Sequence, residues 1–334
     1  MQTGKSFRIA IVGASGAVGQ ELLDVLTRRR FPVRSLRLLG SERSAGKTAS
    51  FQGETLPIER LEADSFAGID LALFSAGASV ARRFAPLAVE AGAVVVDNSS
   101  AYRMDPDVPL VIPEINGTDA AGHRGIIANP NCTTAVTLMA LAPLHGAFGV
   151  RRVFASSYQA VSGTGARAIE ELRTQVAAVS AGQPAVPEVY PHQIAFNVLP
   201  QVDSFLEDGY TKEEMKMQFE GRRILHLPEF RASVTCVRVP VYRAHSVAVN
   251  AEFERPVSLD AARAALQDAP GLKVVDDPAN HRYPMPLDAA GRDDCEVGRL
   301  RLDCALDNGL AFWVSGDQLL KGAALNTVQI AELL

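Results

Sequence analysis

Hydrophobic and polar positions form alternating blocks through the first hundred residues of the chain. Short apolar runs have the length of buried strands, and the segments between them repeat apolar positions with a helical period. The pattern predicts strands at residues 7–12, 35–39, 70–75 and 93–97 and helices at residues 20–29 and 78–91. Because this alternation is typical of a parallel sheet covered by helices, we expect a doubly wound, Rossmann-type α/β domain.

The pattern changes after residue 132, where the alternation of short strands and helices ends. It predicts strands at residues 153–161, 232–241, 247–253 and 310–314 and helices at residues 132–144, 166–178, 211–225 and 319–334. Residues 181–201 are rich in proline and predict an irregular loop, and Pro240 predicts a bend. We expect an α+β domain with a mixed sheet at 132–315, and one domain formed by 1–131 and 316–334.

The first predicted strand runs into a glycine-rich turn that opens a helix. The turn consists of Gly13, Ala14, Ser15, Gly16, Ala17, Val18 and Gly19. Glycines let the backbone approach a pyrophosphate, and the helix N-terminus supplies N–H donors. Ser75 ends another parallel strand and would lie at the same edge. The spacing predicts a dinucleotide site, and a turn with glycines needed only for packing is the alternative.

Polar donors follow two other strands of this predicted sheet. After the strand at 35–39 come Ser41, Arg43 and Ser44, which suit a ribose 2′-phosphate, although Glu42 stands among them. We therefore expect NADP as the cofactor, with a solvated Arg43 as the alternative. Arg103, beyond the strand at 93–97, is a candidate anion clamp or an ordinary surface charge.

Cys132 stands at the start of a long apolar helix, in the segment NPNCTT. Asn131 is placed to cap that helix, which leaves Cys132 in its first turn. Unpaired N–H groups and the positive end of the helix dipole favour a thiolate there, and the same groups could hold an oxyanion. The sequence therefore predicts a nucleophile, with a buried, inert thiol as the alternative.

Five polar residues of the second expected domain carry candidate chemistry. Gln159 lies near a strand end, where its amide could orient a carbonyl group. Glu213 and Lys216 share one helix face, and a solvated ion pair would explain them equally well. Arg238 and His245 flank the bend at Pro240, and histidine suits proton transfer near neutral pH. A structural role for each remains open on these residues alone.

Composition limits the classes of function. The net charge of −5 gives no basic footprint for nucleic acid, and no apolar stretch reaches the roughly 18 residues needed to span a bilayer. Residues 1–8 lack the apolar core of a signal peptide. The four cysteines show neither a CxxC pair nor zinc-ligand spacing, so we expect no metal and a reduced cytoplasmic protein in which Cys236, Cys295 and Cys304 pack in strands.

Taken together, eight segments resemble the aspartate-semialdehyde dehydrogenase family. They are GASGAVG (13–19), SERSAG (41–46), DNSSAYRM (97–104), NPNCTT (129–134), SYQAVSGTG (157–165), EEMK (213–216), CVRVPVYRAHS (236–246) and DQLLKGAALN (317–326). The resemblance implies NADPH-dependent reduction of L-aspartyl 4-phosphate to L-aspartate 4-semialdehyde, with release of inorganic phosphate. This reaction serves the biosynthesis of lysine (through diaminopimelate), threonine, methionine and isoleucine.

The resemblance also implies a role for each matching residue. Cys132 would form the acyl-thioester, His245 would be the acid/base partner and Gln159 would position the acyl group. Arg238 would bind the substrate carboxylate and Glu213 its amino group. The phosphate would be held by Arg103, Asn131 and Lys216. NADP would be contacted by Ser15, Gly16, Ala17, Val18, Arg43, Ser44, Ser162, Gly163 and Gln318. A homodimer is implied by the family.

Three other readings remain open at this point. N-acetyl-glutamyl-phosphate reductase has the same architecture, but EEMK and CVRVPVYRAHS suit a substrate with free amino and carboxylate groups. A non-catalytic paralogue that binds nucleotide would have lost its nucleophile, whereas Cys132 is present. Glyceraldehyde-3-phosphate dehydrogenase shares the cysteine–histidine chemistry, but its motif around the cysteine differs.

Overall fold

The computed structural model describes residues 6–334, in two compact units. The first unit holds the chain up to residue 131 and residues 323–334, and the second unit holds residues 132–322. The chain leaves the second unit at 323 rather than at the expected 316. The reason is that Asp317 and Gln318 are hydrogen-bonded to other segments of the second unit. The expectation that no signal peptide is present was made on residues 1–8, of which residues 1–5 lie outside the described residues.

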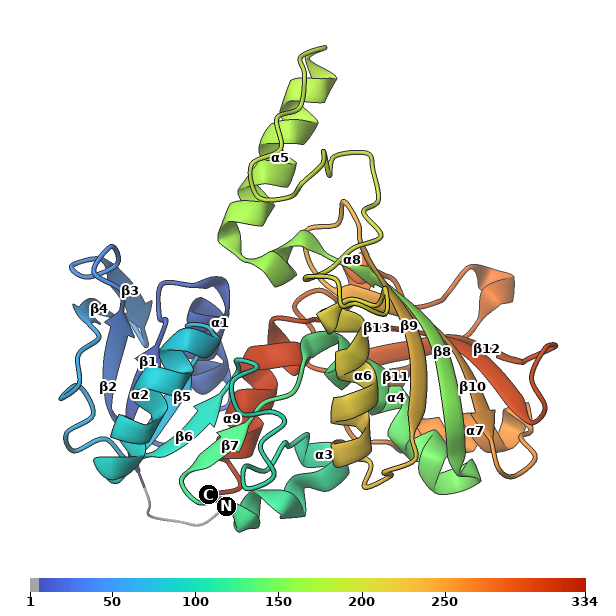
Figure 1. The fold of residues 1–334 in the computed structure, drawn as a ribbon, viewed down its shortest axis with the longest axis horizontal. Helices are drawn as coiled ribbons and strands as arrows, with labels where there is room; N and C mark the ends of the chain where they lie inside the picture. Colours follow the sequence, from blue (N-terminus) through green and yellow to red (C-terminus); the bar gives the residue numbers. More distant parts are fainter. Residues whose placement is uncertain (1–5) are drawn as a thin grey trace. The chain divides into compact units, whose positions relative to one another are not determined.

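The first unit is built on a seven-stranded sheet with the order β3-β4-β2-β1-β5-β6-β7 (Figure 1). Its strands are β1 (Phe7–Val12), β2 (Val33–Gly40), β3 (Thr48–Phe51), β4 (Glu54–Arg60), β5 (Leu71–Phe74), β6 (Val94–Asp97) and β7 (Ile126–Ala128). All neighbouring strands are parallel except β3 and β4. The doubly wound, Rossmann-type fold is confirmed, and the β3–β4 hairpin is an addition that the sequence pattern did not predict.

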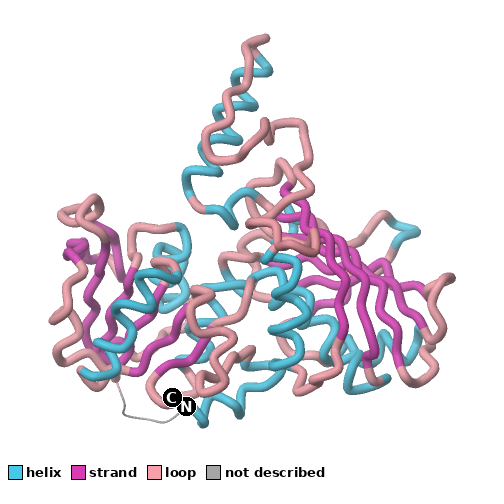
Figure 2. Tube along the Cα trace, in the orientation of Figure 1, coloured by secondary structure: helices cyan, strands magenta, loops and turns pink. Residues whose placement is uncertain are grey.

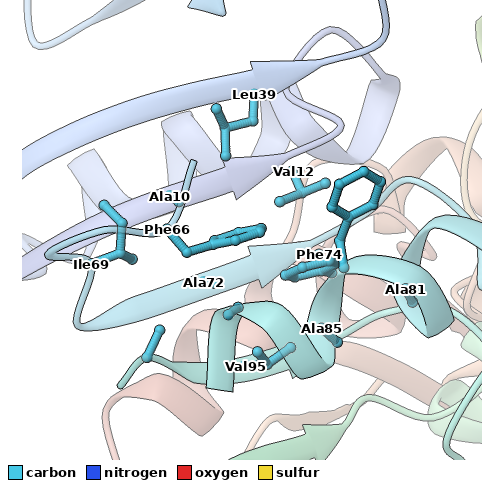
Figure 3. Packing of buried hydrophobic residues seen from close by; sticks show 13 residues of the cluster. Ala10, Val12, Leu39, Phe66, Ile69, Ala72, Phe74, Ala81, Ala85 and Val95 are labelled. Carbon is cyan, nitrogen blue, oxygen red and sulfur yellow. The ribbon is translucent and has the colours of Figure 1, made fainter. Parts of the chain in front are cut away.

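Four helices of the first unit accompany this sheet. They are α1 (Ala17–Arg28), α2 (Ala78–Glu90), α3 (Pro113–Asn116) and α9 (Leu325–Ala331). Figure 3 shows α2 laid over the sheet, with Ala81 and Ala85 facing Phe66 and Phe74, whose rings stack at 5.8 Å. Small side chains on the helix let it approach the strands closely, which keeps the carboxyl ends of β1 and β5 rigidly in place.

The second unit contains a mixed six-stranded sheet with the order β11-β12-β13-β10-β8-β9. Its strands are β8 (Val150–Gln159), β9 (Arg231–Arg238), β10 (His245–Phe253), β11 (Leu272–Val274), β12 (Cys295–Leu302) and β13 (Gly309–Gly316). The outer pairs β8–β9 and β11–β12 are parallel, and the inner pairs are antiparallel. The expected mixed sheet is confirmed. His245 opens β10 instead of preceding it, because it pairs in register with Gly316.

Helices of the second unit differ in how they meet this sheet (Figure 2). They are α4 (Cys132–Phe148), α5 (Ala166–Ser180), α6 (Lys212–Ile224), α7 (Leu259–Gln267) and α8 (Pro286–Ala289). The helix α4 packs on the sheet and is buried along most of its length. The helix α5 instead extends away from the sheet with the loop that follows it (Figure 1), and packs its own small core around Leu172 and Ile194.

The C-terminal segment differs from its prediction. A single helix was expected at 319–334, but a π-helical turn (Leu320–Ala324) precedes α9 (Leu325–Ala331). The wider turn starts beside Asp317, whose backbone carbonyl accepts hydrogen bonds from the N–H groups of Leu320 and Gly322. This departure from the α-helical ladder lies directly against the start of α4, where Gly322 meets Cys132.

Candidate active site

Cys132 is the first residue of α4, and its side chain is partly exposed. The helix behind it is apolar all round and anchored in the core, so the first turn is held rigidly. Gly322 packs against it, since a Cβ atom added to Gly322 would lie 2.6 Å from the Cys132 Cβ atom. The predicted position of the thiol at a helix N-terminus is therefore present.

His245 is fully buried and held in one tautomer. Its Nδ1 atom accepts a hydrogen bond from the Ala160 N–H at 3.0 Å, which places the ring proton on Nε2. Burial, and secondarily the positive charge of Arg238, hold the pKa of the imidazole well below its ordinary value. The neutral form therefore persists at neutral pH, where the sequence had suggested a histidine titrating near neutrality. Within residues 6–334, Nε2 has no hydrogen-bond partner.

Arg238 is buried at the end of β9 and contacts the same residue, Ala160. Its Nη1 atom donates to the Ala160 carbonyl at 2.7 Å, while its Nε atom has no partner among the described residues. The backbone at Gly163 closes over both groups: a Cβ atom there would lie 3.1 Å from Arg238 Nη1 and 3.2 Å from His245 Nε2. A buried guanidinium with an unsatisfied donor is suited to bind a carboxylate.

Gln159, Glu213 and Lys216 form a hydrogen-bonded chain. The Gln159 amide donates to Glu213 Oε1 at 3.3 Å, and Glu213 Oε2 accepts from Lys216 Nζ at 2.7 Å. Lys216 Nζ also lies 3.2 Å from a carboxylate oxygen of Asp203, a residue in the left-handed conformation with φ of 69°. The chain thus presents an acid and a base side by side on α6, as the spacing of three residues predicted.

Gln318 joins two loops of the second unit. Its Oε1 atom accepts from the Ala244 N–H at 2.8 Å, and its Nε2 atom donates to the Ser162 hydroxyl. Ser162 therefore lies beside Gln318, and Gly163 lies beside His245. This proximity is needed if Ser162, Gly163 and Gln318 are to contact one cofactor. The carboxamide of Gln318 keeps one further N–H for a ligand.

The glycine turn of the first unit is shaped for close approach. Gly13 has φ of 91°, and a Cβ atom on it would lie 2.4 Å from the Ser75 carbonyl oxygen. A Cβ atom on Gly19 would lie equally close to the Gly13 carbonyl oxygen. Gly16 caps α1, whose first turn has no acidic residue and no side-chain cap. The N–H groups at this helix start remain available for a pyrophosphate, so the residues fit a dinucleotide.

The loop after β2 meets the glycine turn. The hydroxyls of Ser15 and Ser44 lie 2.9 Å apart, and the Ser44 N–H donates to the Ser41 carbonyl. Glu42, the residue that weakened the NADP expectation, is turned outward, with its side chain 81% exposed and 3.6 Å from Arg60. Arg43 is exposed in the same loop, and among the described residues it forms no ion pair with a carboxylate.

Arg103 and Asn131 belong to the first unit. Arg103 is buried, and it donates to the backbone carbonyls of Asn129 at 2.9 Å and Asn98 at 2.7 Å. It therefore fixes the loop that leads to Asn131 and on to Cys132. Asn326 of α9 reaches the same loop, donating to the Asn129 side chain at 2.7 Å. Arg103 is a buried structural cation in this loop rather than a lone surface charge.

Four residues near these groups were missed by the sequence analysis. They are Ala160, Asp203, Asp317 and Gly322. Ala160 acts through its backbone, which no side-chain motif reveals. Asp317 and Gly322 lie within the segment DQLLKGAALN, which marked this stretch of chain without giving either residue a role, and Asp203 lies ten positions before the segment EEMK. Of the other thiols, Cys236 and Cys295 are buried in strands as expected, but Cys304 is exposed outside any strand.

The first unit has the fold of a dinucleotide-binding domain, and the second unit contains a cysteine in the first turn of a helix and a buried histidine. Residues 8–123 match the NAD binding domain of semialdehyde dehydrogenases, and residues 141–321 match their dimerisation domain. The protein is therefore a member of the semialdehyde dehydrogenase class. None of the helices in residues 6–334 is long and apolar enough to cross a membrane.

Relatives across nearly the full length narrow this class. Aspartate-semialdehyde dehydrogenase of Aquifex aeolicus is 51% identical over 333 residues, covering 98% of each chain. The crystal structure of aspartate semialdehyde dehydrogenase II from Vibrio cholerae, complexed with ASA, has a TM-score of 0.96 at 44% identity and covers 99% of this chain and 98% of that one. The Candida albicans enzyme with NADP has a TM-score of 0.75 at 26% identity, with the same coverage. This chain belongs to the aspartate-semialdehyde dehydrogenase family, as the eight segments predicted.

Proposed function

We propose that this protein reduces L-aspartyl 4-phosphate to L-aspartate 4-semialdehyde with NADPH and releases inorganic phosphate. This step would serve the biosynthesis of lysine, threonine, methionine and isoleucine. The observation that carries the proposal is the pair of buried, unsatisfied atoms, Arg238 Nε and His245 Nε2, whose side chains are both hydrogen-bonded to the backbone of Ala160. A buried polar atom without a partner costs free energy in the free protein, which a bound substrate would recover.

Cys132 is the proposed nucleophile. Its sulfur would attack the acyl carbon, and the N–H groups at the start of α4 would hold the oxyanion that forms. Expulsion of phosphate would leave an acyl-thioester. The bond from carbon to sulfur would break again once the acyl group is reduced, releasing the aldehyde and regenerating the thiolate.

His245 would act in these steps through the proton on Nε2. That atom carries the proton in the observed tautomer, because Nδ1 is occupied by the Ala160 N–H. The neutral ring would donate a hydrogen bond from this N–H to the alkoxide of the thiohemiacetal and keep the proton on Nε2 as the alkoxide collapses to the aldehyde and the carbon–sulfur bond breaks, with the thiolate as the leaving group. The buried position keeps water from the proton and leaves the reacting oxygen as its acceptor.

Recognition of the aspartyl group is assigned to three side chains. Arg238 would bind the α-carboxylate, since its Nε donor is unsatisfied. Glu213, held between Gln159 and Lys216, would accept from the α-ammonium group. Gln159 would then orient the acyl group through its carboxamide, whose two N–H groups face Ser157 Oγ and Glu213 Oε1 in the free protein. A free ammonium and a free carboxylate are needed here, which disfavours an N-acetylated substrate.

The phosphate that leaves is assigned to Lys216, together with Arg103 and Asn131. Lys216 carries a compact positive charge at the partly exposed end of the Gln159–Glu213 chain. It already pairs with Glu213 and Asp203, so phosphate would compete with Asp203 for the ammonium. Arg103 and Asn131 lie in the loop that precedes Cys132.

NADP is the proposed cofactor, and it supplies the hydride when bound. The turn from Gly13 to Gly19 would hold the pyrophosphate on its N–H groups. Ser41, Arg43 and Ser44 would meet the 2′-phosphate, because Glu42 points away from this loop's donors. Ser75, at the end of β5, would line the same edge of the sheet. Ser162, Gly163 and Gln318 would contact the nicotinamide end.

We also propose a homodimer, formed through the face of the second sheet that α4 leaves open. Phe154 and Tyr158 are 44% and 39% exposed on β8, and Tyr158 lies 5.1 Å from the ring of Trp313 on β13. Such an apolar sheet face in a dimerisation domain suits a second copy of the chain. A cytoplasmic location would keep the Cys132 thiol reduced.

The test is the reverse reaction, followed by the absorbance of NADPH. The purified protein receives L-aspartate 4-semialdehyde, NADP⁺ and inorganic phosphate, and we expect NADPH formation that requires phosphate. Cys132→Ala should abolish turnover and retain NADP binding, measured by calorimetry, because the thiol lies in the second unit and the glycine turn in the first. Activity with N-acetyl-glutamate semialdehyde alone would replace the proposed substrate, and turnover by Cys132→Ala would refute the thioester.

A further inference from the structure

Asp317 is a fully buried carboxylate just beyond the end of β13. Its Oδ2 atom accepts from Arg243 Nε at 2.5 Å and from the Gly291 N–H at 2.6 Å. Its Oδ1 atom accepts from the Leu319 N–H at 2.9 Å. One side chain thus joins three segments, one of which leads directly into His245.

Gln318, which follows Asp317, binds Ala244, which follows Arg243. Its Oε1 atom accepts from the N–H of Ala244, which has φ of 70°. A left-handed conformation costs a residue with a Cβ atom about 1 kcal/mol, so Ala244 adopts it only if its surroundings require it. Asp317 therefore binds Arg243, and Gln318 binds Ala244; we call these two contacts the Asp317–Gln318 clamp.

His245 is the residue directly after Ala244, the second residue held by this clamp. It pairs in register with Gly316, the residue before Asp317, and its Nδ1 atom meets the Ala160 N–H. The clamp holds the backbone in the turn that precedes β10. A shift of Ala244 would move the imidazole away from Ala160 and from the position of the reacting oxygen.

We propose that Asp317 is a positioning residue for His245, acting through Arg243 and Ala244. The proposal rests on the proposed function, because it concerns the hydrogen bond assigned to His245. Asp317 touches neither substrate nor cofactor in this scheme. Its charge compensates the Arg243 guanidinium, whose side chain is 30% exposed, and holds that segment against β13.

The test is a double-mutant cycle between Asp317→Asn and His245→Gln. Asparagine keeps an acceptor for the Leu319 N–H but cannot accept from both Arg243 and Gly291. We expect Asp317→Asn to lower kcat up to about 100-fold, since a shift of about 1 Å in a reacting group has that effect. The KM for the semialdehyde should stay within about two-fold, because Arg238 is untouched. In the His245→Gln background the same change should cost less than about two-fold.

Asp276→Asn is the matched control. Asp276 is also a buried carboxylate, with its side chain 2% exposed; it pairs with Arg263 at 2.6 Å and accepts from the Leu300 N–H at 3.3 Å. We expect its removal to lower Tm but to leave kcat within about two-fold of wild type. If Asp317→Asn does not fold, Arg243→Gln breaks the same pair from its exposed side and enters the same cycle.

The outcomes separate the two proposals. Equal losses for Asp317→Asn in both backgrounds would show a structural role and overturn the positioning role. A loss for Asp276→Asn as large as that for Asp317→Asn would do the same. An inactive wild type with semialdehyde, NADP⁺ and phosphate would instead refute the proposed function, whatever the variants show.

Discussion

Gly322→Ala is the substitution that tests most directly how the nucleophile is held. The added Cβ atom would lie 2.6 Å from Cys132 Cβ, 3.0 Å from Cys132 Cα and 3.4 Å from Gln318 Cβ. Carbon atoms pack at about 3.5–4.0 Å, so the shortest contact is too close by about 1 Å. Either the π-helical turn or the first turn of α4 must move by that amount, at a cost of about 1–3 kcal/mol in stability. A displacement of the thiol by about 1 Å predicts a kcat lower by up to about 100-fold.

The assay compares Gly322→Ala with Gly146→Ala, a glycine of the same helix α4 that Cys132 opens. A Cβ atom at Gly146 would meet nothing within 4 Å, so this change should leave kcat unchanged and stabilise the helix by about 0.5–1 kcal/mol. Steady-state kcat in the reverse reaction, the rate of alkylation of Cys132 by iodoacetamide and Tm are measured for both. The packing argument is refuted if Gly322→Ala keeps kcat within two-fold of wild type at an unchanged Tm.

Three further substitutions test charges in the two units. Arg238→Lys should lower kcat/KM for the semialdehyde by about 10- to 100-fold, since one ammonium cannot replace a guanidinium fork, and near-wild-type kinetics would remove Arg238 as the carboxylate ligand. Asp203→Asn should lower the KM for phosphate by about two- to five-fold while the KM for semialdehyde stays constant, because Lys216 loses a partly exposed competitor at 3.2 Å; an unchanged phosphate KM contradicts this. Hydrogen bonds from Arg8 lower the pKa of Asp70 to about 2, so the pair stabilises the fold above the unfolded-state pKa of about 3.9 and loses this contribution as pH falls toward 2. Thermal unfolding of Asp70→Asn should accordingly differ from wild type at pH 6 and converge with it near pH 2, and a constant offset would count against it.

The sequence pattern was sufficient where local rules determine structure. The buried run at 7–12 became β1 with those bounds, and Cys132 opened a helix because an apolar segment followed a turn. The β3–β4 hairpin escaped prediction because its residues alternate with polar ones and its turn, at Gln52 and Gly53, has no strong motif. The π-helical turn at 320–324 also escaped, since the hydrogen bond from the Gly322 N–H to the Asp317 carbonyl is not revealed by helix propensity.

The candidate site divides along the same line. Residue types and motifs pointed to His245, Arg238 and Gln159, but not to the backbone of Ala160, which joins the first two through its N–H and its carbonyl group. That connection depends on β8, β9 and β10 lying side by side, because Ala160 and His245 are 85 positions apart in the chain. The tautomer and the lowered pKa of the histidine follow from this pairing, so a sequence that shows the histidine cannot show its protonation state.

Arg238 and His245 are also coupled through charge, and this coupling links recognition to the role of His245. The pKa of His245 is lowered by burial first and by the positive charge of Arg238 second. A substrate carboxylate bound to Arg238 would offset the second cause, and would raise the pKa of the imidazole while burial continued to hold it down. The imidazole of His245 would then be more basic in the complex than in the free protein. A semialdehyde that lacks the α-carboxylate would therefore lose kcat as well as affinity, because the group that binds at Arg238 also tunes the neighbouring acid.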